Sequence, residues 1–83
     1  MNIFVGNLEF KVKENDLERL FEEYGSVNSA KIITDKVTGR SRGFGFVEMD
    51  DDSEAKTAIS ELHGTTYGSR ELVVNEAKPR KEF

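Results

Sequence analysis

The sequence predicts an α+β domain in which two helices cover one face of a four-stranded antiparallel sheet. Four segments are rich in β-forming residues, with side chains alternating between the two faces of a sheet. Two other segments carry apolar residues at i, i+3, i+4 and i+7, the spacing of an amphipathic helix. The segments follow the order β-α-β-β-α-β, which is that of the ferredoxin-like split unit.

The first half of the chain predicts a strand, a helix and a second strand. The first strand spans residues 2–8 and ends at a Gly-Asn pair, where Asn7 is expected to stabilise the turn. The helix spans residues 14–24, and Gly25 follows it in the position of a helix-terminating glycine. The second strand spans residues 27–34. The apolar stripe of the helix consists of Leu17, Leu20, Phe21 and Tyr24.

The second half predicts a loop over residues 35–41, a strand over 42–49, a helix within 50–64 and a last strand over 71–77. The acidic run that opens this helix suits a cap and the helix dipole better than a metal site. The sole histidine, His63, is interpreted as a surface or capping residue. The expected caps are Asp51, Asp52 or Ser53, the terminator is Gly64, and the apolar stripe is Ala55, Ala58, Ile59 and Leu62.

The composition is that of one small soluble domain. With 83 residues, the chain is near the lower size limit of domains that fold unaided. It has no cysteine, so neither a disulfide nor a thiolate site supports it. No apolar run approaches the ~20 residues of a transmembrane helix, and we expect no signal peptide before the first strand. We expect a monomer without metal, cofactor or membrane contact, located in the cytoplasm, or in the nucleus if the source is eukaryotic.

The charge is segregated along the chain. The net charge of −4 argues by itself against a nucleic-acid binder. However, eleven of the sixteen acidic residues lie in segments 14–24 and 48–61, and so largely on the predicted helices. Segment 31–42 is basic, with Lys31, Lys36, Arg40 and Arg42 against Asp35 alone, and the C-terminal end adds Lys78, Arg80 and Lys81. We expect the acidic helices to lie on the far side of the sheet from the basic residues.

Alternation along the strands assigns the two faces of the sheet. One face is aliphatic and is expected to be the core: Ile3, Val5, Ala30, Ile32, Val47, Met49, Leu72 and Val74. The opposite face carries aromatic rings and cations: Phe4, Lys31, Arg42, Phe44, Phe46, Val73 and Asn75. Burying Lys31 and Arg42 without partners would cost several kcal/mol each. The aromatic face is therefore the open one, and an exposed patch of this kind indicates a partner.

Two segments on the central strands form paired motifs. IFVGNL (3–8) and RGFGFVEM (42–49) resemble the RNP motifs of the RNA recognition motif family, whose octamer has the pattern K/R-G-F/Y-G/A-F-V-x-F/Y. The octamer departs from this pattern only at Met49, which faces the core. The resemblance implies a domain over residues 1–78 with a flexible basic tail at 79–83. It is greatest to the short single-domain members of bacteria and cyanobacteria.

The resemblance implies single-stranded RNA as the partner. Phe4 and Phe44 would each stack on a base, Phe46 would lie against sugars, and Arg42 would pair with a phosphate. Two stacks of about 1–3 kcal/mol each, with a few phosphate contacts, correspond to roughly micromolar binding. Further RNA contacts are expected from Lys31, Asn75, Ala77, Lys78 and Arg80.

The glycines of the octamer also have an expected role. Because Gly43 and Gly45 lack a Cβ atom, we expect them to keep the neighbouring surface low enough for a base to approach.

Other functions on the same fold are less consistent with these residues. A protein-interaction module would be expected to lose the sheet aromatics, whereas this chain keeps all three. An enzyme would need a base, a nucleophile or an anion cradle, and GRSRGFG matches neither the phosphate-binding loop nor the dinucleotide fingerprint. Single-stranded DNA is an alternative ligand, since stacking does not sense the sugar. We therefore predict a non-enzymatic protein that binds single-stranded RNA.

Overall fold

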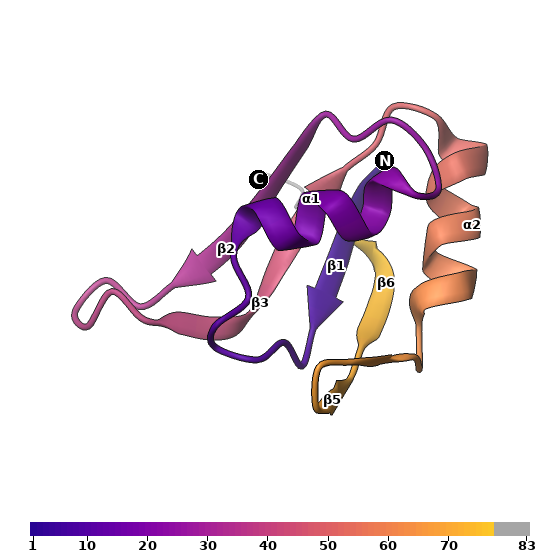
Figure 1. Ribbon diagram of the computed structural model, residues 1–83. Coiled ribbons are helices and arrows are strands. Elements are labelled where there is room, and N and C mark those ends of the chain that lie inside the picture. The colour runs from indigo at the N-terminus through magenta and orange to yellow at the C-terminus, as the bar shows by residue number, and fades with distance from the viewer. Residues whose placement is uncertain (78–83) are drawn as a thin grey trace, which may run out of the picture.

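The computed structural model describes residues 1–77, which form a four-stranded sheet, two helices and a short hairpin (Figure 1). Two residues predicted to contact RNA, Lys78 and Arg80, and the predicted tail at 79–83 lie outside the described residues. Within residues 1–77, no helix is long and apolar enough to cross a membrane.

The strands and helices follow the predicted order. The sheet strands are β1 (Asn2–Gly6), β2 (Ser29–Thr34), β3 (Ser41–Glu48) and β6 (Val73–Ala77). The helices are α1 (Glu14–Glu22) and α2 (Asp52–Leu62). The order across the sheet is β2-β3-β1-β6, and every neighbouring pair is antiparallel. The predicted ferredoxin-like α+β fold is confirmed.

Both helices pack on one face of the sheet, as predicted. Figure 1 shows α1 crossing in front of the sheet and α2 lying beside β6. The buried residues confirm the predicted core face: Ile3, Val5, Ile32, Val47, Met49, Leu72 and Val74, with Ala30 partly buried against them. The helices add Leu17, Phe21, Ala55, Ala58 and Leu62. Leu8 and Val12 were not predicted in the core, and they close it from the β1–α1 connection.

The first helix ends earlier than its apolar pattern predicted. It stops at Glu22, and Gly25 is absent from the glycines with positive φ in the described chain, so it does not terminate the helix in the left-handed conformation. The glycine serves a different purpose, because the Glu54 side chain occupies the space that a Cβ would fill. The Glu54 carboxylate accepts a hydrogen bond from the Ser26 N–H at 3.3 Å, which joins α2 to the loop after α1.

The second helix has the predicted terminal residues. Asp51 is its N-cap, and the carboxylate accepts the Glu54 N–H at 3.0 Å. Gly64 follows the helix with a φ of 83°, the left-handed conformation that glycine adopts without strain. His63 lies between helix and glycine, and its Nδ1 accepts the Val74 N–H at 3.0 Å. The histidine therefore fastens the end of α2 to β6.

A short hairpin between α2 and β6 was not predicted. It pairs β4 (Thr66–Tyr67) with β5 (Arg70–Glu71) around Gly68, whose φ is 70°. A Gly-Ser pair between two short runs is a signal for a two-residue hairpin turn that the sequence did contain. The last strand consequently begins at Val73 rather than at residue 71.

Candidate nucleic-acid interface

Three phenylalanine rings gather on the open face of the two central strands. Phe4 of β1 pairs directly with Phe46 of β3, and Phe44 lies two residues earlier on the same strand. The ring centroid of Phe4 lies 5.8 Å from that of Phe44 and 5.8 Å from that of Phe46, and the centroids of Phe44 and Phe46 are 6.4 Å apart. We call these three rings the aromatic platform. Because the rings shield one another, Phe4 and Phe44 are half-buried, while Phe46 is 37% exposed.

Gly6, which the sequence assigned only to the end of the first strand, leaves room for one ring of the platform. A Cβ on Gly6 would lie 2.8 Å from Cε2 of Phe4, closer than such atoms approach in proteins. The ring of Phe4 therefore lies against the backbone of its own strand, two residues further on, where glycine leaves room for it.

The octamer glycines leave room for neighbouring backbone segments of the protein itself, and their predicted role in the approach of a base stays a prediction. A Cβ on Gly45 would collide with the carbonyl oxygen of Lys31 on the neighbouring strand, so this glycine allows close packing of β2 against β3. Gly43 has a φ of 84°, and its added Cβ would lie 3.3 Å from the Leu8 carbonyl. Both glycines therefore allow close approach of neighbouring backbone segments.

Polar side chains surround the aromatic platform. Lys31 of β2 lies opposite Phe46 of the neighbouring strand β3, and Asn75 of β6 lies opposite Phe4 of the neighbouring strand β1. The guanidinium carbon of Arg42 lies 5.9 Å from the centroid of the Phe44 ring, within range of a cation–π contact. Lys31, Arg42 and Asn75 are exposed. Ala77 is partly buried opposite Asn2 in β1.

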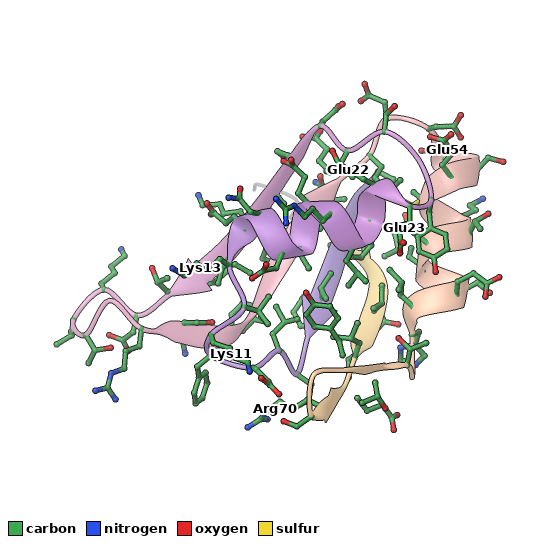
Figure 2. The ribbon with its side chains drawn as sticks, in the orientation of Figure 1. Lys11, Lys13, Glu22, Glu23, Glu54 and Arg70 are labelled. Carbon is green, nitrogen blue, oxygen red and sulfur yellow. The ribbon has the colours of Figure 1, made fainter. Side chains whose placement is uncertain are left out.

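The two cations of the open face keep their charge available. Neither Lys31 nor Arg42 forms an ion pair with any group of residues 1–77. The acidic helix residues lie on the other side of the sheet, as predicted, and Figure 2 shows the labelled glutamates of the helix layer, Glu22, Glu23 and Glu54, at its upper end. A phosphate that approaches Lys31 or Arg42 would therefore meet an unpaired cation of the described chain, whereas Glu48 adds a negative charge further along the same face of β3.

The β2–β3 loop is ordered by a side-chain turn. The carboxylate of Asp35 accepts the backbone N–H groups of Val37 at 2.7 Å and Thr38 at 3.2 Å. These hydrogen bonds lower the pKa of Asp35, with the Val37 N–H contributing most, and the positive charge of Arg42 lowers it further. The Asp35 N–H also donates to the Arg40 carbonyl at 2.7 Å, which closes the loop at the end of the open face.

Two residues outside the predicted site form a second aromatic feature. Phe10, in the β1–α1 connection, is 69% exposed, and the guanidinium carbon of Arg70 lies 5.8 Å from its ring centroid. Sequence reasoning assigned neither residue a role. The available signal was an aromatic residue within the polar segment EFKVK, outside the pattern of either neighbouring element.

The chain is similar in sequence and in fold to known proteins. The family model of the RNA recognition motif matches residues 3–73. RbpA of Synechocystis sp. is 52% identical over 81 residues, which cover 98% of this chain and 80% of the relative. The crystal structure of the RNA-binding protein PG1 is 55% identical, with a TM-score of 0.93 and 99% of each chain covered.

A structure solved with a ligand shares the same fold. The complex of the Sxl-lethal protein with RNA matches at 38% identity and a TM-score of 0.84, covering 92% of this chain and 47% of that one. The family model over residues 3–73 spans β1 to β3, both helices and the aromatic platform, and the match to RbpA covers 98% of this chain. The chain belongs to the RNA recognition motif family.

Proposed function

We propose that this protein binds single-stranded RNA on the open face of its sheet. The observation that carries the proposal is the aromatic platform, in which three rings lie within 6.4 Å of one another beside two cations. Soluble domains rarely expose such a patch unless it meets a partner. Aromatic rings bind the flat faces of bases, and cations bind the phosphates that join them.

The geometry of the rings suggests a different part for each. Phe4 and Phe44 are inclined to each other by only 34°, so two neighbouring bases of one strand would find similarly oriented rings, and each ring would stack on one base. Phe46 stands nearly edge-on to both, at 66° and 89°, and would contact the sugars between the two bases. Stacks of about 1–3 kcal/mol each support roughly micromolar affinity.

Polar groups at the margin of the platform would contact the backbone and base edges. Arg42 and Lys31 are exposed and would pair with phosphates, which makes the affinity depend on salt. Asn75, next to Phe4, has an amide that donates and accepts, so it would reach the edge of a stacked base. Ala77 would contribute main-chain groups at the end of β6. Lys78 and Arg80 remain predicted contacts.

The proposed activity is binding without catalysis. Besides rings, cations and an amide, the open face carries Ser29 and Glu48, which are paired between β2 and β3. No hydrogen bond joins the Ser29 hydroxyl to the Glu48 carboxylate within residues 1–77, which supports binding rather than catalysis. Single-stranded DNA would bind to the same rings, and contacts to the 2′-hydroxyl would decide the preference for RNA.

The proposal is tested by fluorescence-anisotropy titration with a labelled RNA of about eight nucleotides, a length within the usual single-domain range. The same strand annealed to its complement is the matched control, because paired bases cannot lie on the rings. We expect roughly micromolar binding to the single strand and at least tenfold weaker binding to the duplex. Equal affinity for the two forms would show that charge rather than stacking drives binding.

A further inference from the structure

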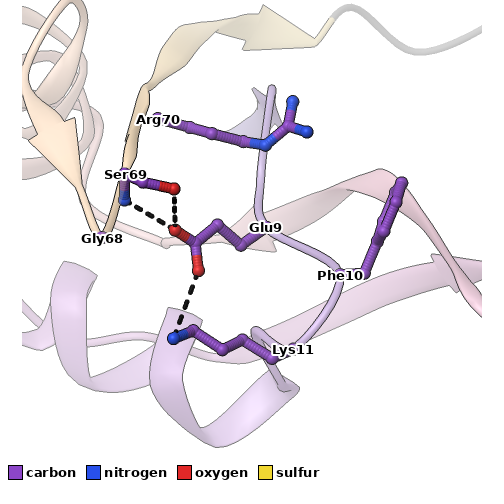
Figure 3. A pocket seen from close by; sticks show the side chains of 6 residues that line it. All are labelled: Glu9, Phe10, Lys11, Gly68, Ser69 and Arg70. Carbon is purple, nitrogen blue, oxygen red and sulfur yellow. Dashed lines mark hydrogen bonds and ion pairs between the residues drawn. The ribbon is translucent and has the colours of Figure 1, made fainter.

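A shallow hollow lies beyond the open face, between the β1–α1 connection and the hairpin. Its volume is about 610 Å³, within the range of ligand sites. Figure 3 shows its lining: Glu9, Phe10, Lys11, Gly68, Ser69 and Arg70. The Arg70 side chain reaches from the hairpin over Glu9 toward the ring of Phe10. The hollow thus combines an exposed aromatic ring with two cationic side chains and one carboxylate.

The ring of Phe10 contributes little to the core. It is 69% exposed, the highest exposure of any phenylalanine within residues 1–77, and it forms no part of the buried cluster. A ring left this far in water does not stabilise the fold by burial. Its position suggests a contact with another molecule.

Arg70 is held in place for such a contact. Its Nη1 donates to Oδ1 of Asn7 at 3.1 Å, while Nδ2 of Asn7 donates to the Glu71 carbonyl at 2.6 Å. Asn7 itself adopts a left-handed backbone conformation, with a φ of 58°. The guanidinium is therefore oriented by the end of β1 and stays free of any carboxylate of the described chain.

The two walls of the hollow are fastened to each other. The Glu9 carboxylate accepts hydrogen bonds from the Ser69 hydroxyl and from the Ser69 N–H, the latter at 2.6 Å, and pairs with Lys11 at 3.4 Å. These contacts lower the pKa of Glu9 to about 2, the Ser69 hydroxyl contributing most. The loop that carries Phe10 and the hairpin that carries Arg70 are thus fixed relative to each other.

The hollow adjoins the proposed RNA-binding face. The Leu8 N–H donates to the Gly43 carbonyl at 2.8 Å, and a Cβ on Gly43 would lie 3.7 Å from the Phe10 ring. Gly43 stands between Arg42 and Phe44 in β3. An RNA strand that runs past Phe44 at this end of the sheet would therefore meet the Phe10 ring next, because Gly43, the residue before Phe44, adjoins that ring.

We propose that a further base of the bound RNA stacks on Phe10 and is covered by the guanidinium of Arg70. This inference rests on the proposed function, since the base belongs to the strand held by the aromatic platform. A base between two planar groups needs about 7 Å, twice the ~3.4 Å stacking rise of nucleic acids. The present separation is 5.8 Å, so Arg70 shifts outward by about 1 Å as the base enters.

The flat ring and guanidinium of the hollow favour a nucleic-acid base over an apolar peptide side chain. Arg guanidinium planes and aromatic rings are the two groups on which unpaired bases stack. The hollow is wide and shallow, with a single aromatic side chain, whereas anchoring of an apolar peptide side chain would need a deeper apolar pocket. A base bound flat on Phe10 would leave its phosphate near Lys11.

The test compares RNAs of two lengths and uses a tryptophan reporter. The chain contains no tryptophan, so Phe10→Trp introduces a single one at the proposed site. An RNA of about eight nucleotides should quench its emission, whereas one of about three, which only covers the aromatic platform, should not. Phe10→Ala should weaken binding of the longer RNA about tenfold, equivalent to ~1.4 kcal/mol, and leave the affinity for the shorter RNA unchanged.

Matched variants separate stacking from other roles. Phe10→Leu keeps the apolar bulk without the ring and should behave like Phe10→Ala, while Arg70→Gln should give a smaller loss confined to the longer RNA. If wild-type protein binds both RNAs and both Phe10 variants bind the longer one with unchanged affinity, the inference is overturned and the proposed function stands. The hollow would then be a structural clamp or a protein contact. If wild-type protein binds neither RNA, both proposals fail.

Discussion

Replacing Phe44 by alanine removes one stacking surface from the centre of the aromatic platform. The ring lies 5.8 Å from Phe4 and 6.4 Å from Phe46, and the Arg42 guanidinium carbon is 5.9 Å from its centroid. The variant therefore affects both the RNA-binding surface and the packing among the three rings. The two effects have different sizes and are measured separately.

The loss of stability should be small. Aromatic pairs contribute about 0.5–1.5 kcal/mol beyond area burial, and Phe44 is only half-buried. We expect the free energy of unfolding to fall by about 1–2 kcal/mol, out of the roughly 5–15 kcal/mol typical of small domains. The variant should remain folded at 25 °C, which urea denaturation followed by circular dichroism would establish.

The same substitution should clearly weaken RNA binding. One base stack is worth about 1–3 kcal/mol, so we expect the dissociation constant for single-stranded RNA to rise tenfold or more, about 1.4 kcal/mol. Anisotropy titration measures this directly. Phe44→Tyr, which keeps the ring, should bind nearly as tightly as wild type. Val73→Ala is a second control, because Val73 is 37% exposed on the same face but has no ring.

The comparison of these variants decides whether the ring acts by stacking. A folded Phe44→Ala protein with unchanged affinity would refute the role of the platform. An equal loss in Val73→Ala would show that general apolar contact, rather than stacking, accounts for the binding.

Three further changes test other parts of the account. Arg42→Ala should reduce the slope of log K against log salt by about 0.7, as for one lost phosphate contact on a single strand; an unchanged slope would remove Arg42 from the contacts. Gly6→Ala should displace the Phe4 ring, which would lie 2.8 Å from the new methyl, and weaken RNA binding while proton NMR reports a shifted ring. Ser69→Ala should raise the pKa of Glu9 from about 2 toward 4.5, observed by carboxyl NMR titration. Because the pKa of Glu9 is lowered in the folded state, the charged carboxylate stabilises the fold above pH 4.5, and this stabilisation is lost as the pH falls toward 2. The pH-dependent loss of stability should be smaller in Ser69→Ala.

The sequence predicted those features that a repeating pattern determines. A strand has only two faces, so the positions of Lys31 and Arg42 were sufficient to identify the open one. The same alternation predicted that Phe4, Phe44 and Phe46 lie on one face, and the distances between their ring centroids confirm it.

Features that depend on contacts between distant segments were not predictable in this way. Glu9 and Ser69 are sixty residues apart, and their hydrogen bonds follow from how the hairpin folds back against the first loop. The meeting of Phe10 with Arg70 has the same origin. Gly25 shows a related limit, since its neighbour is Glu54 on the other helix, and no local pattern distinguishes this packing role from that of a terminating glycine.

The central claim is that RNA lies on the open face of the sheet and not on the helices. Titration of ¹⁵N-labelled protein with a short single-stranded RNA, followed by amide chemical shifts, tests it residue by residue. The account predicts that the largest shifts fall on the central strands around Phe4, Phe44 and Phe46, and on Asn75 and Ala77. Perturbations concentrated on α1 and α2, with the central strands unchanged, would contradict it.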